Sequence, residues 1–375
     1  AFTFRTEDLA FWYVVSLVVA QGLLAVAWFY PQLTQATIAL AKGRYLFLFL
    51  LLRQLVGERF RPGWFLLVLS GEIVFGFTSY FAGFREGIFL AILAAVERFD
   101  YRRRSHWGLV GALGAVLVFC GLLWTGVKGE YRREWHSEAF QQSATARLLR
   151  IKDLSFEWIS SPVSKKIETT DQLVDRLWAV YYPALAVERV PKELPHEDGQ
   201  ILLAAVRHVA MPRLFFPDKE ALVSDSEFVR KYSGVWVAGP EDGVSIAFGY
   251  VAESYVDFGI PVMFVPILVW GAVLGFLYEF FLRAIVRREL AVAFVTLAFW
   301  LAFYLFERSW SRTLGNAGMV FIVVGLGTIL LDRMLPPAGG LVRRPRHRRF
   351  GPGAAAAAPP AEGGLAPAGR PRIGN

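Results

Sequence analysis

Long apolar blocks constrain this chain more than any other feature of its sequence. Six blocks of roughly 20 residues carry few charged side chains, and two weaker blocks extend the pattern. The strong blocks are residues 9–30, 64–81, 107–127, 258–282, 291–306 and 317–335, and the weaker ones are 36–56 and 87–99. Because a helix needs about 20 mostly apolar residues to cross a bilayer, the sequence predicts an all-α polytopic membrane protein with about eight transmembrane helices.

The positive charge of the chain lies mainly beside these blocks. The net charge is +8, and short basic runs occur at 102–104, 287–288 and 343–349. Such runs are typical of the cytoplasmic loops of membrane proteins. We therefore expect no nucleic-acid partner.

The basic runs also predict the orientation of the helices. The runs at 59–61, 102–104, 283–288 and 343–349 all fall on the cytoplasmic side if the helices alternate across the membrane. The connections 82–86, 128–257 and 307–316 then lie on the outer side. This divides the chain into N-terminal transmembrane helices (1–127), a large outer loop (128–257), C-terminal transmembrane helices (258–335) and a tail (336–375).

The outer loop is the one large polar region. Apolar residues recur at helical spacing over 171–187, and prolines divide the rest into short pieces, so the loop is predicted to be partly helical and to cap the membrane face. The tail is rich in Pro, Gly and Ala, which predicts a disordered cytoplasmic segment. The chain begins Ala1-Phe2-Thr3 without a methionine, so we expect further residues upstream.

Two stretches of the outer loop carry residues suited to chemistry. In 210–219, Arg213 and Lys219 lie close together among prolines that fix the backbone. A guanidinium and an ammonium suit a phosphate or pyrophosphate, although ordinary solvated charges in a turn remain an alternative. In 245–259, Glu253 and Asp257 are one helical turn apart and share a face. A carboxylate there could accept a proton from a sugar hydroxyl, or could simply be solvated.

Together these stretches resemble the Wzy-type oligosaccharide repeat-unit polymerases, the O-antigen and exopolysaccharide polymerases of bacteria. The resemblance rests on Pro-Arg-x-x-x-Pro-x-Lys at Pro212, Arg213, Pro217 and Lys219. It continues in Ser-x-x-x-Gly-x-x-x-Glu-x-Tyr-x-x-Phe-Gly at Ser245, Gly249, Glu253, Tyr255, Phe258 and Gly259. The upstream Val190-Pro191 and Gly199 also match, and the similarity is best over 176–275. Glu220 departs from the family pattern, in which a proline often follows the lysine.

The resemblance implies a metal-independent glycosyltransferase in the bacterial inner membrane, with the large loop periplasmic. It implies transfer of a growing glycan from undecaprenyl pyrophosphate to a hydroxyl of the next lipid-linked repeat unit. No cofactor is implied. The expected partners are the undecaprenyl-pyrophosphate-linked glycan, membrane lipid, and the flippase and chain-length regulator of the same pathway.

This chemistry assigns roles to particular residues. The leaving pyrophosphate needs positive charge, and the acceptor hydroxyl needs a base. The expected catalytic residues are Glu253, Arg213 and His208. The expected substrate-binding residues are Lys219, Arg85, Arg308, Arg312, Arg176 and Tyr255. For the arginines in the short outer connections, anchoring at the membrane interface is an equal alternative.

Two other classes of function remain open. A transporter or flippase of the same lipid-linked substrate should carry cationic residues within its spans and paired repeats of helices, but only the block 36–56 is charged and no repeat is visible. Glu72, inside 64–81, could relay protons or make a structural hydrogen bond to another helix. A non-catalytic assembly protein would not need Arg213 or Glu253.

Overall fold

The fold consists of helices, as the apolar blocks predict. The computed structural model describes residues 4–30, 33–57, 60–79, 83–135, 143–177, 180–212, 215–216, 218–220, 222–242, 244–303 and 307–335. All regular elements within these ranges are helices, and no strand occurs among them. The chain divides into two units, Ala1–Pro336 and Pro337–Asn375, and the predicted tail, 336–375, lies outside the described residues.

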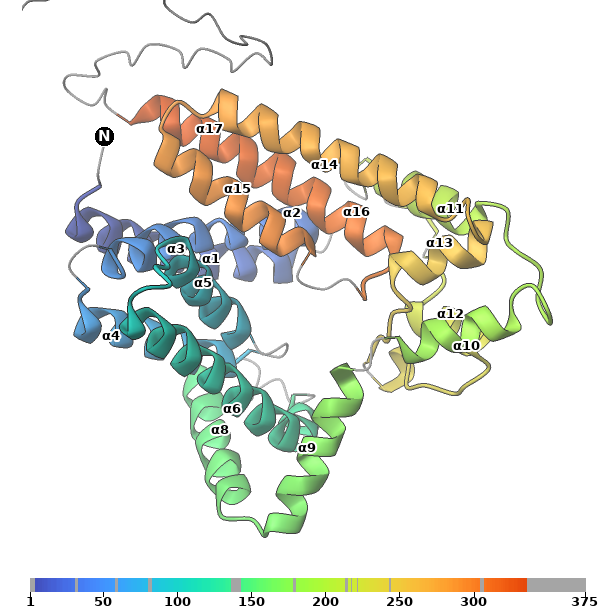
Figure 1. Cartoon of the computed structure of the whole chain (residues 1–375), viewed down its shortest axis with the longest axis horizontal. Helices are drawn as coiled ribbons and strands as arrows, with labels where there is room; N and C mark the ends of the chain where they lie inside the picture. The colour runs from blue at the N-terminus through green and yellow to red at the C-terminus, as the bar shows by residue number, and fades with distance from the viewer. Residues whose placement is uncertain are drawn as a thin grey trace, which may run out of the picture. The chain divides into compact units, whose positions relative to one another are not determined.

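The helices fall into three groups along the chain (Figure 1). The first group is α1 (Thr6–Phe29), α2 (Thr34–Lys42), α3 (Arg44–Leu55), α4 (Pro62–Phe77), α5 (Phe84–Glu97) and α6 (Arg104–Glu134). The second is α8 (Ala144–Ile159), α9 (Val163–Leu177), α10 (Tyr181–Arg189), α11 (Gln200–Ala210), α12 (Asp225–Ser233), η2 (Pro240–Asp242) and α13 (Tyr250–Phe258). The third is α14 (Phe264–Ala284), α15 (Arg288–Phe303), α16 (Trp310–Met319), η3 (Val320–Val324) and α17 (Gly325–Met334).

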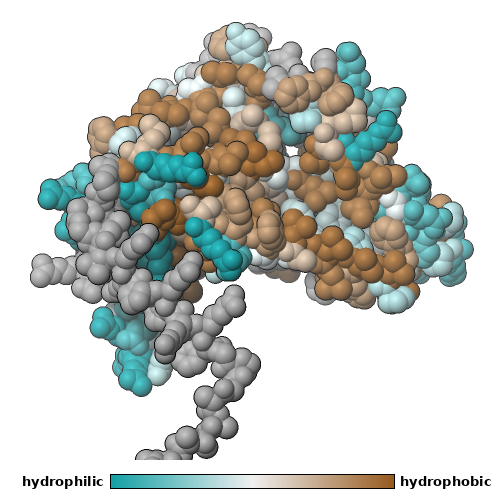
Figure 2. Space-filling model, turned by 90° about the horizontal axis from the view of Figure 1, so that it is seen from above, coloured by the Kyte–Doolittle hydropathy of each residue, from teal (hydrophilic) through white to brown (hydrophobic). Residues whose placement is uncertain are grey.

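All eight predicted apolar blocks are helical over most of their length. Five helices among the described residues are long and apolar enough to cross a membrane: Thr6–Val26, Thr34–Leu55, Arg104–Glu134, Phe264–Ala284 and Trp310–Met334. The other three, α4, α5 and α15, have 16, 14 and 16 residues. Hydrophobic side chains cover most of the face shown in Figure 2, and hydrophilic ones gather mainly toward its ends. The chain is therefore an all-helical membrane protein, and the count of about eight crossings stays a prediction.

Two of the long spans are not regular α-helices. Thr34–Leu55 is interrupted at Gly43, between α2 and α3. Trp310–Met334 contains a π-helical turn, η3, and this turn packs against α2. A π-helical turn holds one more residue than an α-helical turn and often occurs at functional sites.

A buried ion pair joins three helices of the first group. Arg44 Nη1 donates to Glu72 Oε1 at 2.6 Å, and the Tyr13 hydroxyl donates to the same oxygen. Both charged side chains are buried, so Glu72 makes the contact to another helix that its position predicts. Charged groups in hydrocarbon are stable only when they are paired in this way.

The helices α10 to α13 form a small core of their own beside the spans. Its buried side chains are Ala186, Val190, Ile201, Val229, Tyr232, Val237, Phe248, Ala252, Tyr255, Val256 and Met263. Figure 1 shows this group at one end of α14 and α16, where α11 and α13 pack against the start of α16. The predicted outer loop thus contains a compact cap next to the C-terminal spans.

Two glycines of the stretches that resemble the polymerases lie at helix ends within this cap. Gly199 precedes α11 with φ of 86°, and Gly259 follows α13 with φ of 65°, values that L side chains rarely adopt. A Cβ at Gly199 would lie 3.0 Å from Phe258, and one at Gly259 would lie 2.8 Å from His196. Both positions therefore favour glycine for its conformation, and a Cβ at either one would also make the neighbouring ring shift.

Candidate functional site

The site is built around α13, which lies between the first turns of α11 and α16. Six of its residues, 252–257, are buried. The Tyr250 amide donates to Arg308 O at 2.7 Å, which fixes the start of α13 to the segment before α16. The Trp310 indole donates to the Ser254 hydroxyl at 2.9 Å and fixes its middle.

The two carboxylates of α13 each bind the N-terminus of a different helix. Asp257 accepts the amides of Ile201 and Leu202, at 3.0 and 2.8 Å, in the first turn of α11. Glu253 Oε2 accepts the Trp310 amide, at 2.7 Å, in the first turn of α16. Helix N-termini have free amides and a partial positive charge, so both carboxylates stabilise them. Glu253 and Asp257 thus lie on one side of α13, as predicted, and both bind the backbone of neighbouring helices.

Glu253 is also an unusual acid. Only 3% of it is exposed. Burial raises its pKa from the ordinary range to about 8, and the negative charges of Asp225 and Asp257 act in the same direction. The Trp310 amide and the Arg312 charge oppose the rise. A glutamate with a pKa near neutrality can both accept and release a proton under physiological conditions.

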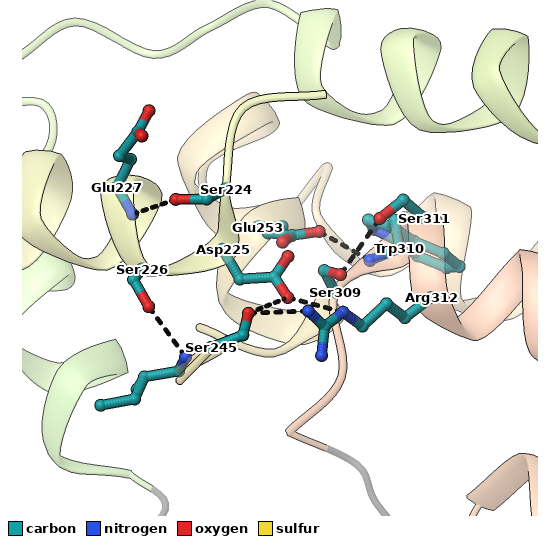
Figure 3. A network of polar contacts seen from close by, with 11 residues as sticks. Ser224, Asp225, Ser226, Glu227, Ser245, Glu253, Ser309, Trp310, Ser311 and Arg312 are labelled. Carbon is teal, nitrogen blue, oxygen red and sulfur yellow. Dashed lines mark hydrogen bonds and ion pairs between the residues drawn. The ribbon is translucent and has the colours of Figure 1, made fainter. Parts of the chain in front are cut away.

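Arg312, whose charge acts on Glu253, belongs to a polar network that reaches the surface (Figure 3). Its Nε lies 2.8 Å from Asp225 Oδ2, and its Nη2 donates to the Ser245 hydroxyl at 2.7 Å. Ser245 is in turn 3.3 Å from Asp225 Oδ2. The Arg312 side chain is 48% exposed, whereas Asp225 is buried, so the network presents a cation at its outer edge.

A large apolar groove adjoins this network. It has a volume of about 480 Å³ and lies between α11, α13, α14 and α16. Trp310 links the groove to the network, because its amide binds Glu253 and its side chain lines the groove. All lining residues are apolar: Leu202, Val206, Phe258, Val262, Val265, Pro266, Val269, Trp270, Val273, Trp310 and Leu314. The arrangement fits an amphiphile with a hydrocarbon chain and a polar head.

The structure brings together three predicted residues and separates others from them. Glu253, Arg312 and the motif residue Ser245 meet in the network. Tyr255, expected to bind substrate, is buried in the core of the cap, and its hydroxyl donates to Val190 O at 2.8 Å.

The pair His208 and Lys219 lies at the far end of α11. Lys219 Nζ donates to the carbonyls of His208 and Met211, at 2.9 and 2.8 Å. Positive charge stabilises the C-terminus of a helix, so Lys219 holds the end of α11 opposite to Asp257. Arg213 lies outside the described residues, and of Arg176 only the backbone, in α9, is described.

The remaining predicted arginines lie near the start of α5 and before α16. Arg85 is half-buried in the first turn of α5, and its Nε is buried without a hydrogen-bond partner among the described residues. Arg308 interacts electrostatically with Lys42, and so does Glu86. Lys42, next to the break at Gly43, is a basic residue that the motifs did not single out.

Asp225 and the groove were missed by the sequence analysis. Ser224 caps α12 by accepting the amide of Glu227 at 3.2 Å, and Ser-x-x-Glu at 224–227 is a recognisable sign of a helix start. That pattern predicts where α12 begins, but not that Asp225 meets Arg312. No group of three or more His, Cys, Asp or Glu side chains within the described ranges is arranged to hold a metal ion.

Comparison with known proteins gives one match. A family model described as a domain of unknown function, DUF8712, matches residues 2–280, which is more than half of the 375 residues. Neither the curated proteins nor the solved structures give a match.

Proposed function

Since the chain belongs to the DUF8712 family, for which no function is described, we propose one from its own residues. The protein is a metal-independent glycosyltransferase of the bacterial inner membrane, with about eight transmembrane helices and a periplasmic loop over 128–257. It polymerises lipid-linked oligosaccharide repeat units, as the resemblance to Wzy-type polymerases implies. The donor is a glycan on undecaprenyl pyrophosphate, and the acceptor is a hydroxyl of the next repeat unit.

One observation carries this proposal. A buried carboxylate with a raised pKa, a half-exposed guanidinium and a wholly apolar groove adjoin one another at the end of a span. A lipid-linked pyrophosphate has matching parts, namely a long hydrocarbon chain, an anionic head and a sugar. The groove supports binding of the chain, and Arg312 supports binding of the head.

The reaction needs one proton transfer and one charge stabilisation. The acceptor hydroxyl oxygen attacks C1 of the donor sugar, the bond between C1 and the pyrophosphate oxygen breaks, and its electron pair leaves with the pyrophosphate. Only the deprotonated form of Glu253 accepts the hydroxyl proton, and with a pKa of about 8 this is the minor form at neutral pH. The proton goes to Oε1, because Oε2 is held by the Trp310 amide. Arg312 stabilises the charge that develops on the pyrophosphate, and Asp225 holds Arg312 in position.

The test is glycan length in a polymerase-deleted host that makes the cognate repeat unit. Wild type, Glu253→Gln, Arg312→Ala and Arg312→Lys are expressed at matched membrane levels, and the glycan is resolved on a gel. We expect a ladder with wild type and single repeats with Glu253→Gln and Arg312→Ala. Arg283→Ala is the matched control, because Arg283 is exposed and pairs with Glu279 in its own helix. A full ladder from both Glu253→Gln and Arg312→Ala would refute the assignment.

A flippase for the same lipid-linked substrate is the second candidate. It is favoured by the interruption of Thr34–Leu55 at Gly43 and by the flanking charges of Lys42 and Arg44. Interrupted helices with charges near the break are typical of transporters. If the protein is a flippase, the double variant Arg44→Met/Glu72→Leu, which leaves no unpaired charge, should block glycan export while Glu253→Gln leaves it unchanged. If it is a non-catalytic assembly protein, neither Glu253→Gln nor Arg312→Ala should shorten the glycan.

A further inference from the structure

The helical hairpin of α8 and α9 has no part in the proposed reaction, yet it exposes several large apolar side chains among its polar ones. Lys166 Nζ donates to Ile159 O at 2.8 Å and closes the turn between the helices. Several large apolar side chains around this turn and along α9 are exposed: Phe156 73%, Ile159 48%, Val163 71%, Ile167 57% and Val174 52%. An exposed patch of this kind usually marks a binding surface.

α9 has two separate apolar faces. One face packs inside the protein, where the Trp158 indole donates to the buried Thr169 hydroxyl at 3.2 Å. The other face carries Val163, Ile167 and Val174, which are four and seven residues apart and so form one stripe along the helix. Packing against the rest of the chain accounts for the first face only.

The contacts of the hairpin place it beside the end of a membrane span. A Cβ at Gly126 of α6 would collide with Trp158, and one at Gly121 would lie 3.9 Å from Leu173. Both glycines belong to the candidate span Arg104–Glu134, whose apolar part ends near Val127. At 1.5 Å per residue, Gly121 lies about 9 Å inside that end. Figure 1 shows the hairpin against the last turns of α6.

We propose that the α8–α9 hairpin lies in the interface of the lipid bilayer. Its apolar stripe contacts the acyl chains, and its charged side chains, which are both basic and acidic, lie at the level of the headgroups. Amphipathic helices enter this boundary by about 5–10 Å, which matches the depth of the contact with Gly121. Lys152 is one turn from Phe156 and Lys166 is one turn from Val163, so a cation accompanies each end of the apolar surface. The lipid surface is the occupant because the hairpin packs against the end of a candidate membrane span, where the boundary of the bilayer lies.

Site-directed fluorescence on the full chain tests this placement. The single cysteine, Cys120, is replaced by alanine, and one cysteine is then introduced by Phe156→Cys, Ile167→Cys or Val174→Cys. Each variant carries an environment-sensitive dye in vesicles of phosphatidylcholine and phosphatidylglycerol. The matched control is Gln172→Cys, which is exposed on the opposite side of α9. Quenching is measured with a lipid that bears a nitroxide near its headgroup and with a water-soluble quencher.

We expect the nitroxide lipid to quench the dyes at 156, 167 and 174 severalfold more strongly than the dye at 172. The water-soluble quencher should show the opposite order. Strong aqueous quenching at all positions would overturn the proposal, because the stripe would then face water. Protection from both quenchers would also overturn it, because a second copy of the chain would then cover the stripe.

Discussion

Glu253 combines two roles that normally exclude each other. Its carboxylate stabilises the N-terminus of α16 best when it is charged, but its burial favours the neutral acid. Burial prevails, since the pKa rises to about 8. At neutral pH Glu253 is therefore protonated in most molecules, at the contact between the cap and the span that begins at Trp310.

This pKa predicts how stability depends on pH. The folded state binds the Glu253 proton up to about pH 8, whereas the unfolded state releases it in the ordinary range of a glutamate. The folded state thus binds more protons in between, so stability falls as pH rises through this window. We expect the unfolding temperature of wild type in detergent to drop between pH 6 and pH 9 more than that of Glu253→Gln. Tryptophan fluorescence during heating gives the measurement, and identical slopes for the two proteins would contradict the prediction.

The backbone geometry at Gly199 predicts how one added methyl group changes the stability of the protein. Its φ of 86° is rare for an L side chain, and a Cβ there would lie 3.0 Å from the Phe258 ring, which would have to shift by a few tenths of an ångström. Gly199→Ala should lower stability by about 1–3 kcal/mol because it adds backbone strain and a steric clash. Gly129→Ala in α6 is the matched control, since a Cβ there meets no other atom and alanine favours helix. Equal unfolding temperatures for both variants would refute the strain argument.

At the scale of the element, α11 is held by side chains at both of its ends. Asp257 binds the amides of its first turn, and Lys219 binds the carbonyls of its last. Loss of such a cap typically removes about 0.5–2 kcal/mol. We therefore expect faster amide exchange at 201–204 in Asp257→Ala and at 208–211 in Lys219→Ala, measured by mass spectrometry. Lys192→Ala serves as the control, and uniform exchange along α11 in all variants would contradict the prediction.

The elements were predicted better than the site they build. Long apolar blocks identify their helices by composition alone, because the bilayer requires length and low polarity. Glu253 was predicted because it lies in one short stretch, and Ser245 belongs to the same stretch only as a residue of the resembling motif. Asp225 and Arg312 are 87 positions apart, and a contact across that distance leaves no local signal. The groove takes its walls from four helices, α11, α13, α14 and α16, so no single stretch reveals it.

At the scale of the whole molecule, the pair Arg44 and Glu72 ties the first group of helices together. Removing one partner leaves an uncompensated charge among apolar residues, which typically costs about 3–5 kcal/mol. We expect Glu72→Leu to lower the unfolding temperature far more than the double variant Arg44→Met/Glu72→Leu. A double-mutant cycle measures this difference. Additive effects of the two single changes would show that the pair does not act as a unit.

The span Trp310–Met334 is attached at both ends to other parts of the molecule. At its start, the Trp310 amide binds Glu253, and near its end Asp332 lies 2.7 Å from Arg287 Nη1 and accepts the Val286 amide at 2.7 Å. For both contacts to form, Trp310 and Asp332 must each point in a particular direction around the helix axis. The angle between them depends on every residue in the span, including the π-helical turn η3.

The extra residue of η3 therefore gives the span a place where its length can change without changing its phase. Removing one residue from 320–324 would restore α-helical winding and leave the direction of the residues beyond it nearly unchanged. Removing one residue from a regular part of the span would instead turn everything beyond it by about 100°. Asp332 would then face away from Arg287 while Trp310 still faced Glu253. Homologous chains are thus expected to tolerate the loss of one residue within this turn, but not elsewhere between the two ends of the span.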